Sequence, residues 1–249
     1  MRYLLLLLVT IATCATAKED STTLQVNQID KGIFLHTSYK MLDDYGLVDS
    51  NGLVLVNGQQ AIIIDTPWSE GDTKALLSWI AEKELKVIAT IDTHSHEDRT
   101  AGLQILNDKL IPTYASESTN EILIREGKPT ATNVFLDSEF PTFEGLVEVF
   151  YPGAGHSKDN LVIWIPENKI LFGGCLVRSL EWDGLGSIGD ASINSWADSI
   201  RNIQSKYTKI ETIVPGHGKA GDISILAHTI KLVEKASEAQ VSRQSNSEK

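Results

Sequence analysis

The chain has 249 residues, with 22 basic and 33 acidic side chains and a formal net charge of −11 at pH 7 when histidine is neutral. This length is enough for one large hydrophobic core and is typical of a single domain of about 200–250 residues. The acidic balance disfavours binding to nucleic acid or to an anionic membrane. We therefore expect no nucleic-acid partner.

The first segment, MRYLLLLLVTIATCATA over residues 1–17, has the three parts of an export signal. Arg2 gives a cationic start, an apolar run follows it, and the segment ends in small residues. The apolar run is too short to span a bilayer core of about 30 Å. We predict a secretory signal peptide over 1–17 and a single periplasmic domain over 18–249, free of the membrane once the signal is removed. Cys14 leaves lipidation as an alternative, although Thr13 is a poor residue to precede a lipidated cysteine.

The rest of the chain alternates predicted strands and predicted helices. Ser69, followed by Asp72, resembles a capping box at the start of one of these helices. Neither a repeat nor a Pro/Ser-rich linker divides the chain, so the pattern predicts one α/β domain in which helices cover the faces of sheets. Apolar, β-branched runs predict strands at 53–57, 61–66, 86–93, 147–153, 161–166, 169–175 and 211–218, and apolar residues at three- and four-residue spacing predict helices over 69–84, 192–207 and 221–240.

Removal of the signal takes away one basic residue and no acidic one, leaving 21 basic and 33 acidic residues and a net charge of −12. It also leaves a single cysteine, Cys175. A lone cysteine in an exported protein has no internal disulfide partner. It is therefore a buried spectator, an intermolecular link, or a reactive or metal-bound thiolate.

Metal-capable side chains follow four of the predicted strands. Most of them stand beside glycine or another small residue, which predicts loops at one edge of the sheets, where α/β proteins collect ligands. The segment IDTHSHED supplies His94, His96 and Asp98, YPGAGHS supplies His156, LFGGC supplies Cys175, and VPGHG supplies His217.

These six residues divide into two tetrahedral zinc sites, each with three protein ligands and one open position. Zinc binds imidazole nitrogen, thiolate and carboxylate, and a catalytic zinc keeps its fourth position for water. Three histidines would make one site, and Asp98, Cys175 and His217 the other. In an extended segment, side chains two apart share a face, so the H-x-H-x-D spacing predicts that His94, His96 and Asp98 converge. His36 and His228 lie outside this pattern and are assigned to no metal.

Four motifs in this order, HSHEDRTAG, GAGHSKDN, GGCLVRS and PGHGKAG, resemble those of the metallo-β-lactamase superfamily, and most closely the class B β-lactamases of subclass B1. The resemblance covers nearly the whole mature chain, including DTPW at 65–68 and LGSIGDA at 185–191. It implies a four-layer αββα sandwich with the metal site at one edge of two sheets. It also implies one zinc on His94, His96 and His156 and a second on Asp98, Cys175 and His217, two zinc ions per chain.

The function implied by the resemblance is hydrolysis of the amide bond of β-lactam antibiotics, carbapenems included, by a secreted monomer that confers resistance. A zinc-bound hydroxide would attack the lactam, with Asp98 as a ligand and a proton carrier. One alternative is a thioester or lactone hydrolase of the same fold. Many of those enzymes have histidine after the motif aspartate and a bridging aspartate at the cysteine position, where this chain has Arg99 and Cys175. Another alternative is a non-enzymatic zinc protein, although structural zinc sites are usually closed by four ligands.

Two further residues are expected to orient the metal ligands from outside the coordination sphere. Arg99 follows the motif aspartate directly, and Asp65 ends the predicted strand in IIIDTP. The alternatives are a surface salt bridge for Arg99 and a turn cap for Asp65.

The substrate side of the site departs from the commonest family pattern at two positions. Arg178 stands where many members have a lysine for the substrate carboxylate, and it keeps the charge with a planar donor fork. Ser187 stands where many members have an asparagine near the substrate carbonyl, which leaves that contact open. The segment 36–48 is expected to form a hairpin flap over the site. The alternatives without a role in substrate binding are a solvated arginine for Arg178 and a solvated turn for the flap.

Overall fold

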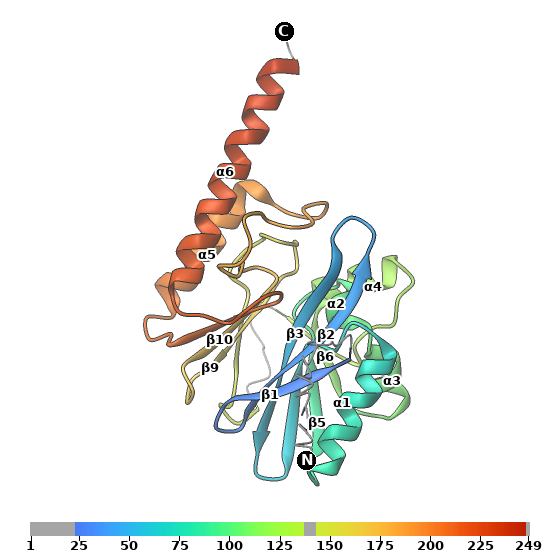
Figure 1. The fold of residues 1–249 in the computed structure, drawn as a ribbon. Coiled ribbons are helices and arrows are strands. Elements are labelled where there is room, and N and C mark those ends of the chain that lie inside the picture. Colours follow the sequence, from blue (N-terminus) through green and yellow to red (C-terminus); the bar gives the residue numbers. More distant parts are fainter. Residues whose placement is uncertain (1–22, 137–142, 248–249) are drawn as a thin grey trace, which may run out of the picture.

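The structure is a computed structural model that describes residues 23–136 and 143–247, and its two β-sheets are packed between helices (Figure 1). The predicted signal over 1–17, with Cys14, lies outside the described residues. One sheet runs in chain order through β1 (Gln25–Asp30), β2 (Ile33–Leu42), β3 (Gly46–Asn57), β4 (Gln60–Ile64), β5 (Lys86–Ile91), β6 (Thr113–Ser116) and β7 (Asn133–Phe135). The other has the order β11 (Thr212–Pro215), β10 (Ile170–Gly174), β9 (Val162–Ile165) and β8 (Glu148–Phe150).

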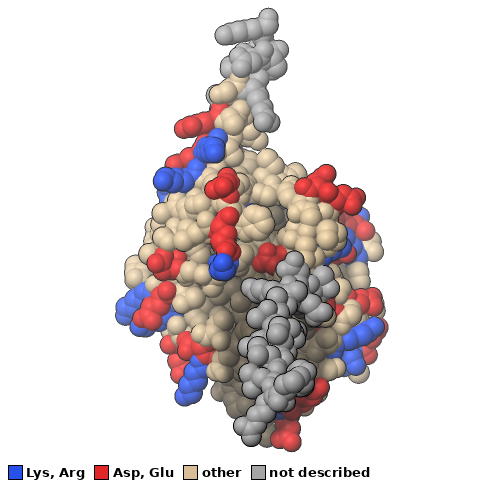
Figure 2. All heavy atoms as spheres, in the orientation of Figure 1, with Lys and Arg blue, Asp and Glu red and all other residues tan. Residues whose placement is uncertain are grey.

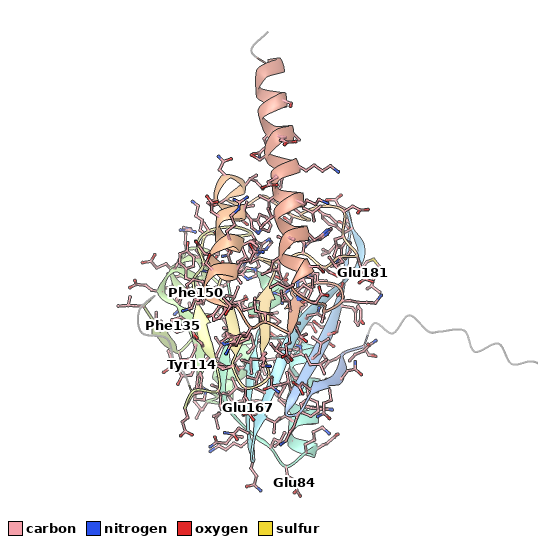
Figure 3. All side chains as sticks on the ribbon, turned by 90° about the vertical axis from the view of Figure 1, so that its left-hand side faces the viewer. Glu84, Tyr114, Phe135, Phe150, Glu167 and Glu181 are labelled. Carbon is pink, nitrogen blue, oxygen red and sulfur yellow. The ribbon has the colours of Figure 1, made fainter. Side chains whose placement is uncertain are left out.

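Helices flank the pair of sheets on both outer faces, which makes four layers. The first sheet is covered by α1 (Glu70–Glu82), α3 (Leu103–Asp108) and α4 (Glu117–Arg125), with the single turn α2 (Glu97–Thr100) at one end. The second is covered by α5 (Ile193–Lys206) and α6 (Ser224–Ser247), which lie side by side over it (Figure 3). The predicted αββα sandwich is confirmed.

The central strands are apolar on both faces because each face meets another layer. Along β3, Leu53 and Leu55 pack in the cluster between the sheets, whereas Val54 packs with α1. In β10, Phe172 joins the cluster between the sheets and Leu171 joins the cluster under α5 and α6. Alternate residues of a strand point to opposite faces, so a strand buried on both sides reads as an uninterrupted apolar run.

All the predicted strands and helices are present, although several bounds differ. The α1 prediction is confirmed at its first residue, since the backbone N–H of Asp72 donates to Ser69 Oγ at 3.0 Å and caps the helix. The strand predicted at 53–57 is only the second half of β3, and α6 continues past the predicted end at 240. Sequence analysis missed β1, β6 and β7 together with α2, α3 and α4, whereas β2 and the start of β3 form the hairpin predicted over 36–48.

The loops that carry chemistry leave the sheets at the same end of the molecule. In the first sheet β4, β5 and β6 run parallel, and in the second β10 runs parallel to β11, so the segments after β5, β10 and β11 meet at one edge. Glu181, from the loop after β10, marks this end in Figure 3, and Glu84 and Glu167 mark the opposite end. This edge therefore gathers side chains from both sheets.

The surface seen in Figure 2 carries acidic and basic side chains interspersed, with acidic ones more frequent. Within the described part of the chain, every helix is too short or too polar to cross a membrane.

Candidate metal centre

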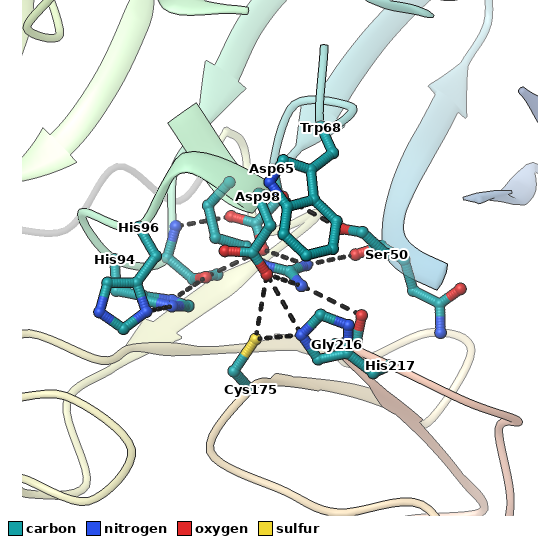
Figure 4. Close-up of polar contacts among 12 residues, drawn as sticks. Ser50, Asp65, Trp68, His94, His96, Asp98, Cys175, Gly216 and His217 are labelled. Atoms are coloured by element: carbon teal, nitrogen blue, oxygen red, sulfur yellow. Dashed lines mark hydrogen bonds and ion pairs between the residues drawn. The ribbon is translucent and has the colours of Figure 1, made fainter. Parts of the chain in front are cut away.

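Three histidines meet at the edge between the sheets, with one nitrogen of each turned toward the others. His94 and His96 follow β5, and His156 comes from the loop after β8 in the other sheet. His96 Nδ1 lies 3.2 Å from His94 Nε2 and 3.0 Å from His156 Nε2 (Figure 4 shows the first two). Ligands at about 2.1 Å around a tetrahedral zinc are about 3.4 Å apart, so these nitrogens are close to the spacing that one ion requires.

Hydrogen bonds from the rest of the protein fix which nitrogen of these rings is free. Thr93 Oγ1 donates to Asp65 Oδ2 at 2.9 Å, so it accepts from His94 Nδ1 at 3.2 Å and leaves Nε2 without a proton. His96 Nε2 donates to Asp190 Oδ2 at 3.2 Å, which leaves Nδ1 free. A metal-binding imidazole is usually held in this way through its other nitrogen. His156 Nδ1 is buried and has no partner among the described residues.

A second cluster joins a carboxylate, a thiol and an imidazole. Asp98 Oδ2 lies 3.5 Å from Cys175 Sγ and 3.2 Å from His217 Nε2, and the sulfur lies 3.3 Å from the same nitrogen (Figure 4). The Nδ1–H of His217 donates to the backbone carbonyl of Asp49, so Nε2 is the ring nitrogen that faces the cluster. Cys175 is 2% exposed. The structure thus brings all six predicted residues together, with the histidines linked by the two distances above and Asp98, Cys175 and His217 forming a metal-capable group. Two further metal-capable groups cross between these sets: one joins His94 and His96 with Asp98, and the other joins His94 and His156 with Cys175.

An extended segment was predicted to bring His94, His96 and Asp98 together, and this prediction is wrong at Asp98. His96, the residue before α2, has extended backbone, with φ −69° and ψ 152°. Asp98 lies inside α2, where the backbone N–H groups of Arg99 and Thr100 donate to the His96 carbonyl. The chain therefore turns between the second and third motif residues. This turn sends His96 toward the histidine cluster and Asp98 toward Cys175.

Arg99 is completely buried, so the alternative of a surface salt bridge is wrong. Its Nε and Nη2 donate to Asp98 Oδ2 at 3.0 and 2.6 Å, and its Nη1 donates to Asp65 Oδ2 at 3.3 Å. The remaining donors go to the backbone carbonyls of Asn51 and Gly216. All five N–H groups are used, and two carboxylates compensate the buried charge.

Asp65 is more than a turn cap, because its carboxylate connects the histidine loop to Arg99. Its Oδ1 accepts from the Thr93 backbone N–H at 2.7 Å, and its Oδ2 accepts from both Thr93 Oγ1 and Arg99. Burial raises the pKa of Asp65 to about 6, although Arg99 opposes the shift. Asp65 therefore remains mainly ionised at neutral pH.

Electrostatics give the two clusters different protonation states in the metal-free protein. Burial, with each histidine's neighbours, holds the pKa of His94 and of His156 well below the usual value. Burial alone would raise the pKa of Asp98, but Arg99 and His217 hold it well below the ordinary range. For His217, burial acts downward, yet Cys175 and Asp98 raise its pKa to about 10. The first cluster thus offers neutral imidazoles, whereas in the second the Asp98 carboxylate faces a protonated His217, which must lose its Nε2 proton before it can bind a metal.

Both clusters border a pocket of about 480 Å³, which His96 and His156 line from the first and Asp98 and His217 from the second. The predicted flap is a hairpin formed by β2 and β3, and its residues Leu42, Tyr45 and Val48 line the pocket. Arg178 and Ser187 also line it. Arg178 is only 7% exposed, so the alternative of a solvated arginine is wrong. Ser187 is exposed. The pocket is further lined by Trp68, His96, Glu97, Asp98, Lys128, His156, Trp182, Gly184, Leu185, Gly186, Asp190 and His217.

Sequence analysis missed several residues that support the ligands. Thr93 and Asp49 hold His94 and His217, but neither follows a pattern that would single it out. Asp190, which accepts from His96, lies within the LGSIGDA motif. This motif could therefore have indicated Asp190 as well as Ser187. His36 and His228 are in none of the metal-capable groups found among the described residues. His36 Nε2 donates to the Asp65 carbonyl, and His228 Nε2 donates to the Trp182 carbonyl.

Comparison with known proteins identifies relatives along most of the chain. The model of the metallo-beta-lactamase superfamily matches residues 45–217. A metallo-beta-lactamase type 2 from Pseudomonas aeruginosa is 41% identical over 206 residues, which are 83% of this chain and 82% of that protein. The structure of TMB-1 has a TM-score of 0.84 and 55% identity, covering 86% of this chain and 99% of its own. The structure of DIM-1 metallo-beta-lactamase exposed to ceftazidime has a TM-score of 0.84 and 48% identity, covering 86% of this chain and 98% of its own.

The chain belongs to the metallo-β-lactamase superfamily. The αββα sandwich, the histidines, aspartate and cysteine clustered at its edge, and these relatives all support this assignment. Within that superfamily its relatives include type 2 metallo-β-lactamases and TMB-1. The predictions of subclass B1 and of an enzyme of this family are confirmed.

Proposed function

We propose that the protein hydrolyses the amide bond of β-lactam antibiotics, carbapenems among them, with two zinc ions per chain. The observation that supports this most directly is that the six candidate ligands form two adjacent sets of three, four of whose members line one pocket. A structural zinc site would be expected to present four protein ligands.

The donor atoms fit zinc at both clusters. The ring nitrogens of His94 and His96 are freed by hydrogen bonds on the opposite side of each ring, and His217 is fixed likewise by Asp49. Thiolate, imidazole and carboxylate together favour zinc over calcium or magnesium, which prefer oxygen ligands alone. When bound, zinc supplies Lewis acidity and lowers the pKa of a bound water towards about 7, which makes a nucleophile available at neutral pH.

The residues of this chain would then orient the ligands and the substrate. Arg99 and Asp65 hold Asp98 and the histidine loop from a fully buried position, so these ligands are preorganised before substrate arrives. Because the pKa of Asp98 is held low, Asp98 remains a carboxylate in the resting protein, and we propose that it carries a proton only during turnover.

Arg178 is proposed to bind the carboxylate that nearly all β-lactam drugs carry. Its side chain lies in the pocket wall, and its Nε donates to the Gly184 carbonyl at 3.1 Å. Among the described residues no hydrogen bond engages its two terminal nitrogens, which leaves them for a carboxylate. Ser187, exposed on the same wall, is proposed to contact the substrate carbonyl region, and the apolar flap residues cover the substrate.

Export to the periplasm and a monomeric state are part of the same proposal. The tripartite sequence of 1–17 supports a signal peptide, and the resistance that a β-lactamase confers requires it to meet the drug outside the cytoplasm.

The experiment that tests the function compares substrates and metal on the purified mature protein. We expect rapid hydrolysis of a carbapenem, loss of it after exhaustive chelation, and recovery with added zinc. A thioester and a lactone serve as comparison substrates for the alternative hydrolases of this fold. Full activity after chelation, or a stable acyl-enzyme seen by mass spectrometry, would contradict the mechanism, and turnover of the thioester or lactone alone would contradict the substrate class.

A further inference from the structure

The pocket wall that carries Arg178 has no helix or strand of its own. Residues 178–187 form turns and irregular backbone between β10 and α5, yet they supply Arg178, Trp182, Leu185 and Ser187 to the pocket. Such a segment keeps its shape only through the contacts that its atoms make with more rigid elements.

Two adjacent residues of α6 make such contacts. Thr229 Oγ1 accepts the backbone N–H of Arg178 at 2.8 Å, and His228 Nε2 lies 2.9 Å from the Trp182 carbonyl oxygen. A carbonyl oxygen only accepts, so His228 Nε2 carries the proton and is the donor. Thr229 is fully buried and donates its own hydroxyl to the Ile225 carbonyl at 2.8 Å, which leaves an oxygen lone pair for Arg178.

The helix that provides these contacts is firmly packed. Ile225, Leu226 and Val233 are buried in the cluster between the second sheet and α5 and α6. Because His228 is in the same turns of helix, its ring starts from a fixed backbone, and its hydrogen bond transmits that fixed position to Trp182.

Trp182 in turn contacts the residue that is proposed to bind substrate. The guanidinium carbon of Arg178 lies 5.6 Å from the centroid of the Trp182 ring, within the range of a cation–π contact. The Arg178 Nε bond to the Gly184 carbonyl closes the same turn. Displacement of the Trp182 backbone would therefore move the surface against which the guanidinium rests.

We infer that His228, remote from the metal clusters, is a positioning residue for the carboxylate-binding side of the pocket, acting through Trp182 on Arg178. The inference rests on the proposed function of Arg178. His228 touches no substrate in this arrangement, and its role is to fix the direction of the Arg178 donor fork.

The test uses three variants of the full mature protein. His228→Leu removes the donor, His228→Gln keeps an N–H at nearly the same reach, and Lys231→Leu adds the same apolar side chain at an exposed position of the same helix. For a carbapenem, we expect His228→Leu to raise KM about three- to tenfold with kcat and zinc content unchanged, as loss of one hydrogen bond predicts. The methyl ester of the same drug should be affected less. His228→Gln and Lys231→Leu should behave as wild type.

A second readout does not depend on turnover. The ¹⁵N–¹H resonance of Arg178 Nε, assigned by its loss in Arg178→Lys, should shift in His228→Leu and stay in place in His228→Gln. An unmoved resonance or an unchanged KM in His228→Leu would overturn the inference, as would equal losses on acid and ester that His228→Gln fails to rescue. Absence of β-lactam hydrolysis by the wild type would instead count against the proposed function, and the resonance would still decide the role of His228.

Discussion

Cys175 is the residue whose character depends most on its neighbours. From sequence it was open whether the thiol is a spectator, a link or a ligand, and the structure places its sulfur 3.3 Å from His217 Nε2 and 3.5 Å from Asp98 Oδ2. Burial and this company exclude an intermolecular disulfide in the folded protein and favour a metal-bound thiolate.

Replacement of Cys175 by serine should weaken one metal site selectively. A hydroxyl is a far poorer zinc ligand than a thiolate, so the zinc content under limiting metal should fall from about two towards one per chain. Metal analysis after dialysis against dilute zinc measures this directly. If stoichiometry and turnover are those of the wild type, the thiol is a buried spectator after all.

Replacement of Arg178 by alanine should reduce kcat/KM for a carboxylate-bearing β-lactam by roughly ten- to 150-fold, the equivalent of a charge-assisted hydrogen bond of about 1.5–3 kcal/mol. Most of this loss should appear in KM if the contact is already made in the ground state. Arg178→Lys should recover much of it through the retained charge. Steady-state kinetics on the acid and on its methyl ester provide the comparison, and equal losses on both would show that Arg178 acts through folding or metal binding.

His36 should make the stability of the metal-free protein depend on pH. Burial lowers its pKa to about 4 from an ordinary value of 6.5. Between pH 6.5 and about 4, His36 is protonated in the unfolded chain but neutral in the native protein. The free energy of unfolding should therefore fall as the pH drops through this range. The shift corresponds to about 3 kcal/mol over this window. Urea unfolding at pH 7 and pH 4.5 should show a smaller pH effect in His36→Gln, in which His94 and His156 still titrate. An identical pH effect in both proteins would contradict the assignment.

At the scale of elements, the success of sequence analysis follows burial. Strands β4 and β10 are buried on both faces and read as continuous apolar runs, which made them easy to predict. Strand β1 has mostly exposed residues, and β2 mixes polar and apolar ones, so neither shows such a run. Strands β6, with the sequence TYAS, and β7, with the sequence NVF, are short and lack the continuous apolar run that made the equally short β9 visible.

The same limit separates the metal ligands from their supporting residues. The six candidate ligands could be predicted because His94, His96 and Asp98 form a compact motif, and because His156, Cys175 and His217 are of rare residue types and follow glycine near strand ends. The roles of Asp190 and Asp49 could not, because each depends on contact with a histidine that is distant in sequence. The turn at α2 also could not be read from alternation, since four residues are too short for a helical pattern.

At the scale of the whole molecule, the two clusters connect the halves of the sandwich. His94, His96 and Asp98 come from the half that contains the first sheet, and His156, Cys175 and His217 come from the half that contains the second. Each proposed zinc therefore takes ligands from both halves, so bound metal should stabilise the native protein against unfolding.

Removal of zinc should accordingly lower Tm. Metal at 1,000 times its dissociation constant contributes about 4 kcal/mol, which for a chain of this size is a shift of about 10 °C. Scanning calorimetry of the protein before chelation, after chelation and after zinc is restored measures the change. A Tm that is the same in all three states would mean that the clusters do not hold metal in the native protein.

The division of ligands between the two sheets also determines when the metal arrives. No continuous stretch of chain can assemble either site, and a peptide of residues 93–102 would present His94, His96 and Asp98 without the partners that orient them. A complete site therefore forms only when the two sheets have come together, so we expect zinc to be taken up from the solution in which folding is completed. For a chain exported as predicted, that solution lies beyond the cytoplasmic membrane. The supply of zinc there, rather than the amount of protein synthesised, would then set how much of the enzyme is competent.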